Sequence, residues 1–329
     1  MVKKFKIAST ELDNRYILAP LAGYTDCAMR KICSSFSSSL NYTEMISAEA
    51  LFYNSKDTIK EIKDTYIDKE NRSRLAIQLF GGNSEHIIEA LKIVKNIGHY
   101  DFIDFNCGCP VNKVIKQKAG SFWLKRQDEL FHLLKEMVKI SDKPVILKTR
   151  IGFSSIIDMN HFVKEVEKCN VSAISIHGRT REEFFSSKVH YDVIKECKKN
   201  ASIPIIANGG INEDNFLDVF KQTDADALMI GQRAVGYPKV FQDMVDIESG
   251  KRKEETTLLS QLKTLKKHVQ LMYMYKDEKV ASCQLRSISL KYLKGYKIDN
   301  EIKKRLISAK KEEDYLDVIS SLMSLNKHI

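Results

Sequence analysis

The stretch "SAISIHG" (residues 172–178) is a short apolar run that ends in a histidine and a glycine. Seven other runs of this kind occur along the chain, at residues 16–20, 41–45, 75–80, 101–106, 144–150, 204–210 and 227–232. Amphipathic segments of helical length lie between them. Apolar strands that alternate with helices indicate parallel strands covered by helices. Eight such units in about 235 residues predict an α/β fold, a (β/α)8 TIM barrel, rather than a doubly wound sheet.

Two of the amphipathic segments have clear starting points. In residues 84–97 the sequence predicts Ser84 as the N-cap, and in residues 128–140 it predicts Asp128 in the same role. After Gly250 the strand signal stops. The charged segment "GKRKEE" (250–255) is typical of a linker, and the rest of the chain is predicted to be helical. We therefore expect a catalytic barrel in residues 1–249 and an all-helical domain in residues 250–329.

The net positive charge is concentrated in the tail. Residues 250–329 contain 18 Lys and Arg against 10 Asp and Glu, whereas residues 1–249 contain 35 against 33. Clustered basic residues gain affinity for nucleic acid by releasing its condensed counterions. The tail is therefore a candidate for binding RNA or another anionic polymer. A lysine-rich solvated surface is an equally good explanation at this point.

Composition narrows the class of protein. The chain has 329 residues, of which 43% are hydrophobic, which suits a globular protein of one or two domains. We expect no membrane partner, because no apolar run approaches the ~18 residues of a membrane span, and the basic start is not followed by a signal-like apolar segment. Seven cysteines at irregular spacings do not suggest a disulfide framework. We expect a cytoplasmic protein with reduced thiols.

In a barrel of this class the active site lies at the carboxyl ends of the strands. The polar residues and turns there include "APLAG", Gln78, Asn106 with "CGCP", Lys148, Arg150, His177 with "GRT", "NGG" and "GQR". Lys148 is informative because a bare ammonium inside an apolar strand is costly without an anionic partner or water. The glycine turns after the last two strands are candidates for a phosphate site, although glycines also serve simply to make tight turns.

The segment "CGCP" contains two thiols, Cys107 and Cys109. A metal site would need two further ligands, and Cys27 and Cys33 do not offer the usual paired spacing, so we expect no metal. A nucleophile would need a depressed pKa, and the sequence shows no adjacent acid or base. A proton donor and simple packing are the roles that remain open.

Seven segments together resemble the flavin-dependent tRNA-dihydrouridine synthases in order and spacing. They are "LAPLAGYTDCAMR", "AIQLFGG", "YDFIDFNCGCP", "VILKTRIGF", "ISIHGRTRE", "IPIIANGGI" and "ALMIGQRAVGYPKVF". The resemblance covers roughly residues 12–245 and continues more weakly into "QLRSISLKYLKGY" (284–296). It implies an FMN-binding barrel with a helical RNA-binding domain, which reduces specific uridines in tRNA with NADPH as the reductant.

The resemblance also implies roles for individual residues. Pro20, Leu21 and Ala22 would lie along the flavin, Gln78, Lys148 and His177 would contact its ring, and Asn208, Gly209, Gly210, Gly231 and Gln232 would hold its phosphate. Asn106 and Arg179 would face the uridine, and Cys109 would donate the proton. Cys107 would then pack. In the tail, Arg286 falls at helical spacing with Lys291 and Lys294 and could form part of a basic RNA-binding face.

Some features depart from the family pattern. The family usually has Gly-Arg-Gly or Gly-Arg-Ala after strand eight, whereas this chain has Gly231-Gln232-Arg233. Glu183, Phe185 and Ser187 replace the Gln, Tyr and Gly that are common after "HGRTRE". The rival interpretations are the same reaction on ribosomal RNA, a flavin barrel that acts on a small molecule, and an RNA-binding protein with vestigial flavin chemistry. We expect a monomer.

Overall fold

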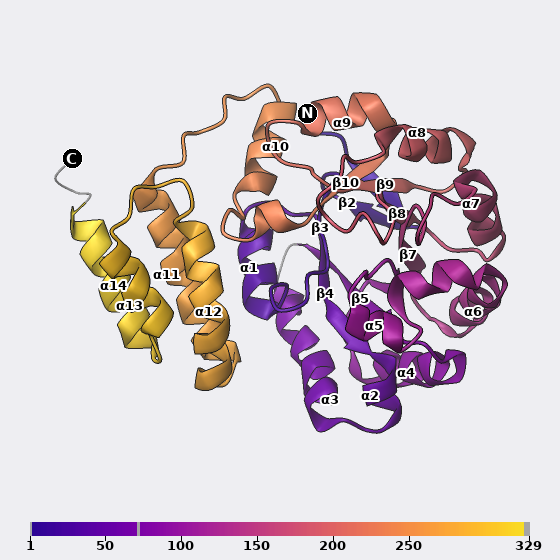
Figure 1. The fold of residues 1–329 in the computed structure, drawn as a ribbon, viewed down its shortest axis with the longest axis horizontal. Helices are drawn as coiled ribbons and strands as arrows, with labels where there is room; N and C mark the ends of the chain where they lie inside the picture. The colour runs from indigo at the N-terminus through magenta and orange to yellow at the C-terminus, as the bar shows by residue number, and fades with distance from the viewer. Residues whose placement is uncertain (1, 71–72, 326–329) are drawn as a thin grey trace.

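Eight parallel strands form a closed barrel in the computed structural model, which describes residues 2–70 and 73–325. The order around the barrel is β10-β3-β4-β5-β6-β7-β8-β9, which confirms the predicted (β/α)8 fold (Figure 1). Their bounds are β3 Tyr16–Leu18, β4 Leu40–Ser47, β5 Arg74–Phe80, β6 Phe102–Cys107, β7 Val145–Arg150, β8 Ile174–His177, β9 Ile205–Asn208 and β10 Ala227–Ile230. Each strand coincides with one of the eight apolar runs.

Helices surround the barrel and cover the outer face of the strands (Figure 1). The longer ones are α1 Cys27–Ser35, α3 Lys56–Lys63, α4 Ser84–Ile97, α6 Gln127–Ile140, α7 Met159–Lys168, α8 Tyr191–Asn200, α9 Phe216–Thr223 and α10 Val240–Glu248. Shorter elements are α2 Ala48–Phe52, η1 Asp64–Glu70, α5 Asn112–Lys116, η2 Gly120–Lys125 and η3 Gln232–Ala234. The apolar stripes of the longer helices pack on the strands and form the main core.

Two predicted helix starts were wrong by one or two residues. The N-cap of α4 is Asn83, whose side chain accepts the N–H groups of Glu85 and His86, and Ser84 is the first helical residue. The helix α6 begins at Gln127, so Asp128 lies inside its first turn. A carboxylate in the first turn still interacts favourably with the positive end of the helix dipole. An aspartate near a helix start therefore looks the same in the sequence whether it is the N-cap or lies in the first turn.

A small hairpin that the sequence did not predict closes the amino-terminal end of the barrel. Strands β1 (Phe5–Ile7) and β2 (Thr10–Leu12) pair antiparallel. Phe5, Ile7 and Leu12 form one buried cluster with the residues that fill the lower barrel interior. The hairpin therefore closes the end of the barrel opposite the carboxyl ends of the strands.

The last part of the chain forms a separate helical layer beside the barrel (Figure 1). Its helices are α11 Leu258–Tyr275, α12 Glu278–Tyr292, α13 Asn300–Ser308 and α14 Glu312–Leu325, and they share their own apolar core. Ala28 on α1 is part of that core, and Lys276 forms an ion pair with Asp26 at 2.7 Å. The tail is thus packed against the barrel through α1. Within the described residues, no helix combines the length and the apolar character needed to cross a membrane.

Candidate active site

The strand register brings the predicted residues to one end of the barrel. Lys148 lies opposite Asn106 on the neighbouring strand, and His177 lies between Arg150 and Asn208. Lys148 Nζ donates to Asn208 Oδ1 at 3.0 Å, and Asn208 Nδ2 donates to the Met229 carbonyl at 2.8 Å. The carboxyl ends of β6 to β10 therefore form a single polar cluster at the barrel mouth.

Asn106, Gln78 and Asp104 form a hydrogen-bonded chain that runs from the mouth into the barrel. Asn106 Nδ2 donates to Gln78 Oε1 at 2.8 Å, and Gln78 Nε2 donates to Asp104 Oδ2 at 2.6 Å. Asn106 Nδ2 also contacts Met45 Sδ at 3.1 Å. Gln78 and Asp104 are fully buried. Two of the four hydrogen-bonding positions of the Gln78 amide are thus engaged by the protein itself.

The loop that carries Cys109 is held from both sides. Asn106 Oδ1 accepts the N–H of Gly108 at 3.2 Å and that of Cys109 at 2.9 Å. The Cys109 carbonyl accepts the N–H of Ser121 at 3.1 Å and its hydroxyl at 3.0 Å. Gly120 has φ 62°, and a Cβ there would lie 2.7 Å from the Cys109 carbonyl oxygen, so this close approach requires glycine. The thiol is therefore mounted on a rigid loop.

The two thiols of this loop have different environments. Cys107 is fully buried in the main core, and burial raises its pKa to about 12. Cys109 is 9% exposed, and it packs with Val114 and Ala119 beside Met45 and Phe80. Burial also raises the pKa of Cys109, although the backbone N–H of Val111 and the charges of Arg150 and Lys148 oppose the shift. Both thiols stay protonated at neutral pH, and Cys109 is the one with access to the mouth.

Burial dominates the electrostatics of the cluster. It lowers the pKa of Lys148 to about 8, with a further lowering from Arg150. Burial raises the pKa of Asp104 well above its usual range, against the hydrogen bond from Gln78 and the charge of Lys148. Burial and the nearby cations Arg150, Lys148 and Arg179 hold the pKa of His177 well below its usual range. His177 is therefore neutral.

The tautomer of His177 follows from its neighbour. Arg179 Nη1 lies 3.3 Å from His177 Nε2. An arginine N–H can only donate, so Nε2 is the acceptor and the ring proton is on Nδ1. Arg179 also donates from Nε to the Ser187 carbonyl at 2.7 Å, which holds its half-buried side chain along the loop after β8.

The turns after β9, β10 and β3 lie next to one another. Gly209 and Gly210 have φ 116° and 66°, and a Cβ on Gly209 would lie 2.7 Å from the His177 ring. Ala19 N–H donates to the Ile230 carbonyl at 2.8 Å, so the turn of Pro20, Leu21 and Ala22 lies beside Gly231. Backbone groups from three strands therefore surround one small region of the mouth. Such turns suit close approach of a phosphate.

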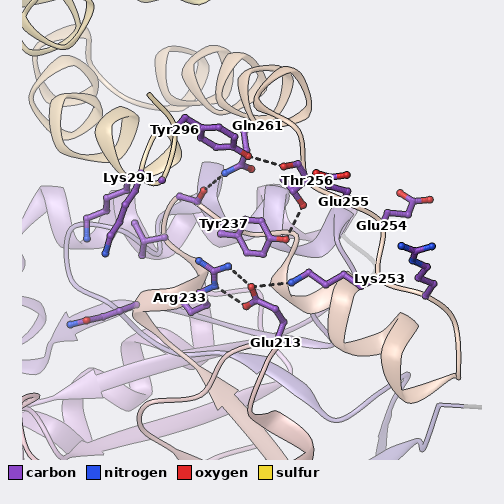
Figure 2. A pocket seen from close by; sticks show the side chains of 16 residues that line it. Glu213, Arg233, Tyr237, Lys253, Glu254, Glu255, Thr256, Gln261, Lys291 and Tyr296 are labelled. Atoms are coloured by element: carbon purple, nitrogen blue, oxygen red, sulfur yellow. Dashed lines mark hydrogen bonds and ion pairs between the residues drawn. The ribbon is translucent and has the colours of Figure 1, made fainter. Parts of the chain in front are cut away.

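Arg233 does not point at this region as a free cation. Its guanidinium forms a two-point ion pair with Glu213 and lies 4.1 Å from the centre of the Tyr237 ring. Lys253, from the linker before α11, also donates to Glu213 at 3.4 Å (Figure 2). Gln232 is exposed and lies beside this cluster. The basic residue of the turn therefore lies one position later than in the family pattern and pairs beside the linker.

A cavity of about 1260 Å³ lies between this turn and the helical tail (Figure 2). Its walls include Arg233, Tyr237, Lys291, Lys294 and Tyr296. Tyr237 and Tyr296 both bond to Thr256, the residue after the linker, at 2.8 Å each. Lys291 and Lys294 of the predicted basic face line the cavity, whereas Arg286 is half-buried and its Nε is shielded from solvent.

Comparison with known proteins agrees with this geometry. A family model described as dihydrouridine synthase matches residues 17–326. The chain belongs to the dihydrouridine synthase family. The probable tRNA-dihydrouridine synthase of Aquifex aeolicus is 33% identical over 297 residues, 89% of this chain and 91% of that protein. The tRNA-dihydrouridine synthase B of Vibrio vulnificus is 31% identical over 327 residues, 96% of this chain and 100% of that protein.

Solved structures share the barrel fold of this dihydrouridine synthase family member. The old yellow enzyme of Trypanosoma cruzi superposes with a TM-score of 0.57 at 12% identity, covering 79% of this chain and 94% of that one. A morphinone reductase variant superposes with a TM-score of 0.56 at 11% identity, covering 78% and 93%. At these identities the likeness concerns the fold.

Sequence reasoning did not single out one residue of this family member's candidate site, Asp104, and it named another, Arg150, without assigning it a role. Asp104 is the buried end of the amide chain, and its signal was a carboxylate inside the apolar run 101–106, the same kind of anomaly that singled out Lys148. Arg150 is buried and donates to the Gly108 carbonyl at 2.9 Å and the Thr180 carbonyl at 2.8 Å. Its role as a connector of two loops depends on tertiary contacts that no sequence pattern reveals.

Proposed function

We propose that this protein reduces specific uridines in tRNA to 5,6-dihydrouridine, with FMN as its bound cofactor and NADPH as the reductant. The observation that carries the proposal is a protonated thiol, Cys109, on a rigid loop at the same mouth as Lys148, His177 and the glycine turns. The tRNA-dihydrouridine synthases among the relatives support tRNA as the substrate.

The residues at the mouth fit FMN. The left-handed Gly209 and Gly210, next to Gly231, provide the open backbone that a phosphate needs. Lys148 supplies a cation where burial already disfavours its charge, so an anionic group beside it would relieve that cost. Asn208 orients the Lys148 ammonium. Gln78 retains hydrogen-bonding positions for the polar edge of the ring.

The chemistry divides between the cofactor and the protein. When bound and reduced by NADPH, FMN supplies the hydride that adds to C6 of the uracil ring. Addition at C6 leaves carbanion character at C5, which requires a proton. Cys109 Sγ is the donor in this proposal, because burial keeps it protonated at neutral pH. The bonds from Asn106 and Ser121 to its backbone hold the sulfur in position.

Asn106 and Arg179 are proposed to face the uridine. All four hydrogen-bonding positions of the Asn106 amide are engaged, by Gln78, Met45, Gly108 and Cys109. A bond to uracil would require Asn106 to exchange one of these contacts, and the weak one to the Met45 sulfur is the least costly to lose. Arg179 has a half-buried guanidinium next to His177 and is well placed to donate to a uracil carbonyl.

The proposed function is tested with purified protein and total tRNA from a bacterial strain that lacks dihydrouridine synthases. The protein should be yellow, should release FMN on denaturation, and should form dihydrouridine when NADPH is added. Ribosomal RNA from the same strain is the second substrate. A protein that neither contains nor takes up FMN contradicts the proposal. A flavoprotein that modifies only ribosomal RNA, or neither RNA, would preserve the flavin assignment and overturn the tRNA substrate.

A further inference from the structure

Two phenylalanines at the rim of the mouth expose apolar rings that the proposed reaction does not use. Phe184 is 43% exposed and Phe185 is 46% exposed, and both lie on the loop between β8 and α8. Their ring centres are 4.8 Å apart and nearly perpendicular, at 80°. A contiguous pair of exposed aromatic rings is unusual on the surface of a soluble protein and commonly marks a binding site.

The loop holds these rings outward by specific contacts. Phe184 has φ 54°, a left-handed conformation that a bulky residue keeps only when its surroundings impose it. Arg150 donates to the Phe184 carbonyl at 2.9 Å. The Glu183 carboxylate accepts the Thr180 N–H at 2.6 Å and contacts His190 Nε2 at 2.7 Å. The exposure of the pair is therefore built into the fold of the loop.

The pair lies directly beside the active-site cluster. The ring of Phe185 is 6.1 Å from that of His177, with 30° between the planes, and the Arg150 guanidinium lies 5.3 Å from the centre of the Phe185 ring. On the preceding loop, two cations lie near the ring of Phe153: the charged groups of Lys125 and Arg181 are 4.0 Å and 5.3 Å from its centre. Aromatic rings interleaved with cations are the arrangement by which proteins bind unpaired nucleic acid strands.

We propose that Phe184 and Phe185 form a stacking platform for the unpaired RNA base next to the uridine that is reduced. This inference rests on the proposed function. A uridine can reach the bottom of the mouth only after it leaves its base stack, which exposes one face of its neighbour. An aromatic ring at the rim covers that face and keeps the RNA open. Phe185 stands where the family commonly has tyrosine, so an aromatic ring is retained here without its hydroxyl.

The test compares Phe185→Leu with Phe185→Trp, because leucine keeps the apolar bulk and loses the flat ring, whereas tryptophan keeps the ring. Tyr66→Leu is the matched control. Tyr66 is 47% exposed and lies on η1, just before β5, at the opposite end of the barrel. For each variant, the dissociation constant for dihydrouridine-free total tRNA is measured at several salt concentrations. Flavin reduction by NADPH without RNA is followed separately.

Phe185→Leu is expected to weaken tRNA binding about 5- to 100-fold, the range typical of losing one stacked base. Phe185→Trp and Tyr66→Leu should stay within about twofold of the wild type. The slope of log Kd against log salt should not change in any variant, because stacking releases no counterions. Flavin reduction should be unaffected, which separates a binding defect from a damaged active site.

Two results would overturn the platform. One is unchanged tRNA affinity of both Phe185→Leu and the double variant Phe184→Ala/Phe185→Leu, with wild-type protein active on the same tRNA. The other is an equal loss in Phe185→Leu and Phe185→Trp, which would show that the loop conformation and not the ring matters. Failure of the proposed function is distinct from both, because the wild-type protein itself would then form no dihydrouridine in tRNA.

Discussion

The side-chain oxygen of Asn106 accepts the backbone N–H of Cys109 at 2.9 Å, and this contact fixes the direction of the bonds behind it. A backbone N–H can only donate, so Oδ1 is the acceptor and Nδ2 is the donor to Gln78. Gln78 must then donate from its own Nε2 to Asp104. The loop that carries the thiol is therefore linked, with a defined polarity, to a carboxyl group inside the barrel.

The first prediction tests this chain at Asp104. Asp104→Asn keeps a neutral group whose oxygen can accept from Gln78, whereas Asp104→Leu leaves a buried N–H of Gln78 without an acceptor. We expect Asp104→Leu to lower the free energy of unfolding by about 1–3 kcal/mol, and to accelerate alkylation of Cys109 by iodoacetamide because its loop loosens.

The alkylation is measured on the Cys109 peptide by mass spectrometry in a Cys283→Ser background, since Cys283 is the exposed cysteine of this chain. Asp104→Asn should behave like the parent protein in both measurements. If the asparagine and leucine variants are equally impaired, the charge of Asp104 matters and the hydrogen-bonded chain does not.

The second prediction separates the two thiols. Cys109→Ala should keep bound FMN and its reduction by NADPH, yet form dihydrouridine about 10²–10⁴-fold more slowly, the usual contribution of a general acid. Cys107→Ala should retain activity within a few-fold and lose about 1 kcal/mol of stability, because its fully buried sulfur fills space in the core. Product in dihydrouridine-free tRNA and flavin reduction are measured side by side. Loss of product in Cys107→Ala alone would reverse the assignment.

The barrel was predictable because its signal repeats. Most of the strands are apolar runs with few polar residues, and a parallel strand covered on both faces needs that composition. The hairpin of β1 and β2 was missed because its strands have three residues each, too few to show an alternating pattern. The N-cap of α4 was misplaced because Asn83 and Ser84 are both good capping residues, and only the backbone conformation distinguishes them.

The site was predictable where a polar residue interrupts an apolar strand or where a family motif marks it. The partners of these residues were not predictable. The ion pair between Arg233 and Glu213 joins residues that are 20 positions apart, and the basic face of the tail depends on how α12 rotates against its neighbours. Arg286 falls at helical spacing with Lys291 and Lys294, yet it is half-buried with its Nε shielded from solvent, while Lys291 lines the cavity.

The third prediction concerns Lys148 and pH. The pKa of Lys148 is lowered to about 8 from an unfolded value near 10.5, so below about pH 8 the folded state holds a disfavoured charge. Between pH 8 and 10.5 the unfolded chain binds more protons, and this residue makes stability rise with pH. Lys148→Met should therefore make the FMN-free protein more stable than wild type at pH 7, by a few degrees in Tm, with a difference that shrinks toward pH 10.

Bound FMN should reverse the order of stability and make the wild type more stable than Lys148→Met. An anionic cofactor beside Lys148 favours the charged ammonium, so the methionine variant should bind FMN at least about tenfold more weakly. Thermal unfolding with and without FMN across this pH range checks both parts. A methionine variant that is less stable without FMN, or that binds FMN as tightly as wild type, contradicts the assigned role.

The fourth prediction concerns the tail. Deleting residues 250–329 would uncover the face of α1 that carries Ala28, so point substitutions are the better test. The double variant Lys291→Ala/Lys294→Ala should weaken tRNA binding and lower the slope of log Kd against log salt by about 1 to 2. Flavin reduction by NADPH should not change.

The matched control is Lys304→Ala/Arg305→Ala, which removes two exposed cations from α13 outside the cavity. Its slope should stay at the wild-type value. Equal slopes in the two double variants would mean that the tail attracts RNA only through its overall charge, with no particular role for the cavity wall.

The first and last strands of the barrel are hydrogen-bonded to each other, with Tyr16 opposite Leu228. During synthesis the barrel cannot close until residue 230 has left the ribosome, so β3 remains an unpaired sheet edge while most of the polypeptide is made. The apolar side of α1 stays exposed for longer, until α11 has emerged to cover it. Exposed edges and apolar faces are the features that drive aggregation of nascent chains. Chaperone dependence of this protein should therefore depend on how fast its last third is translated.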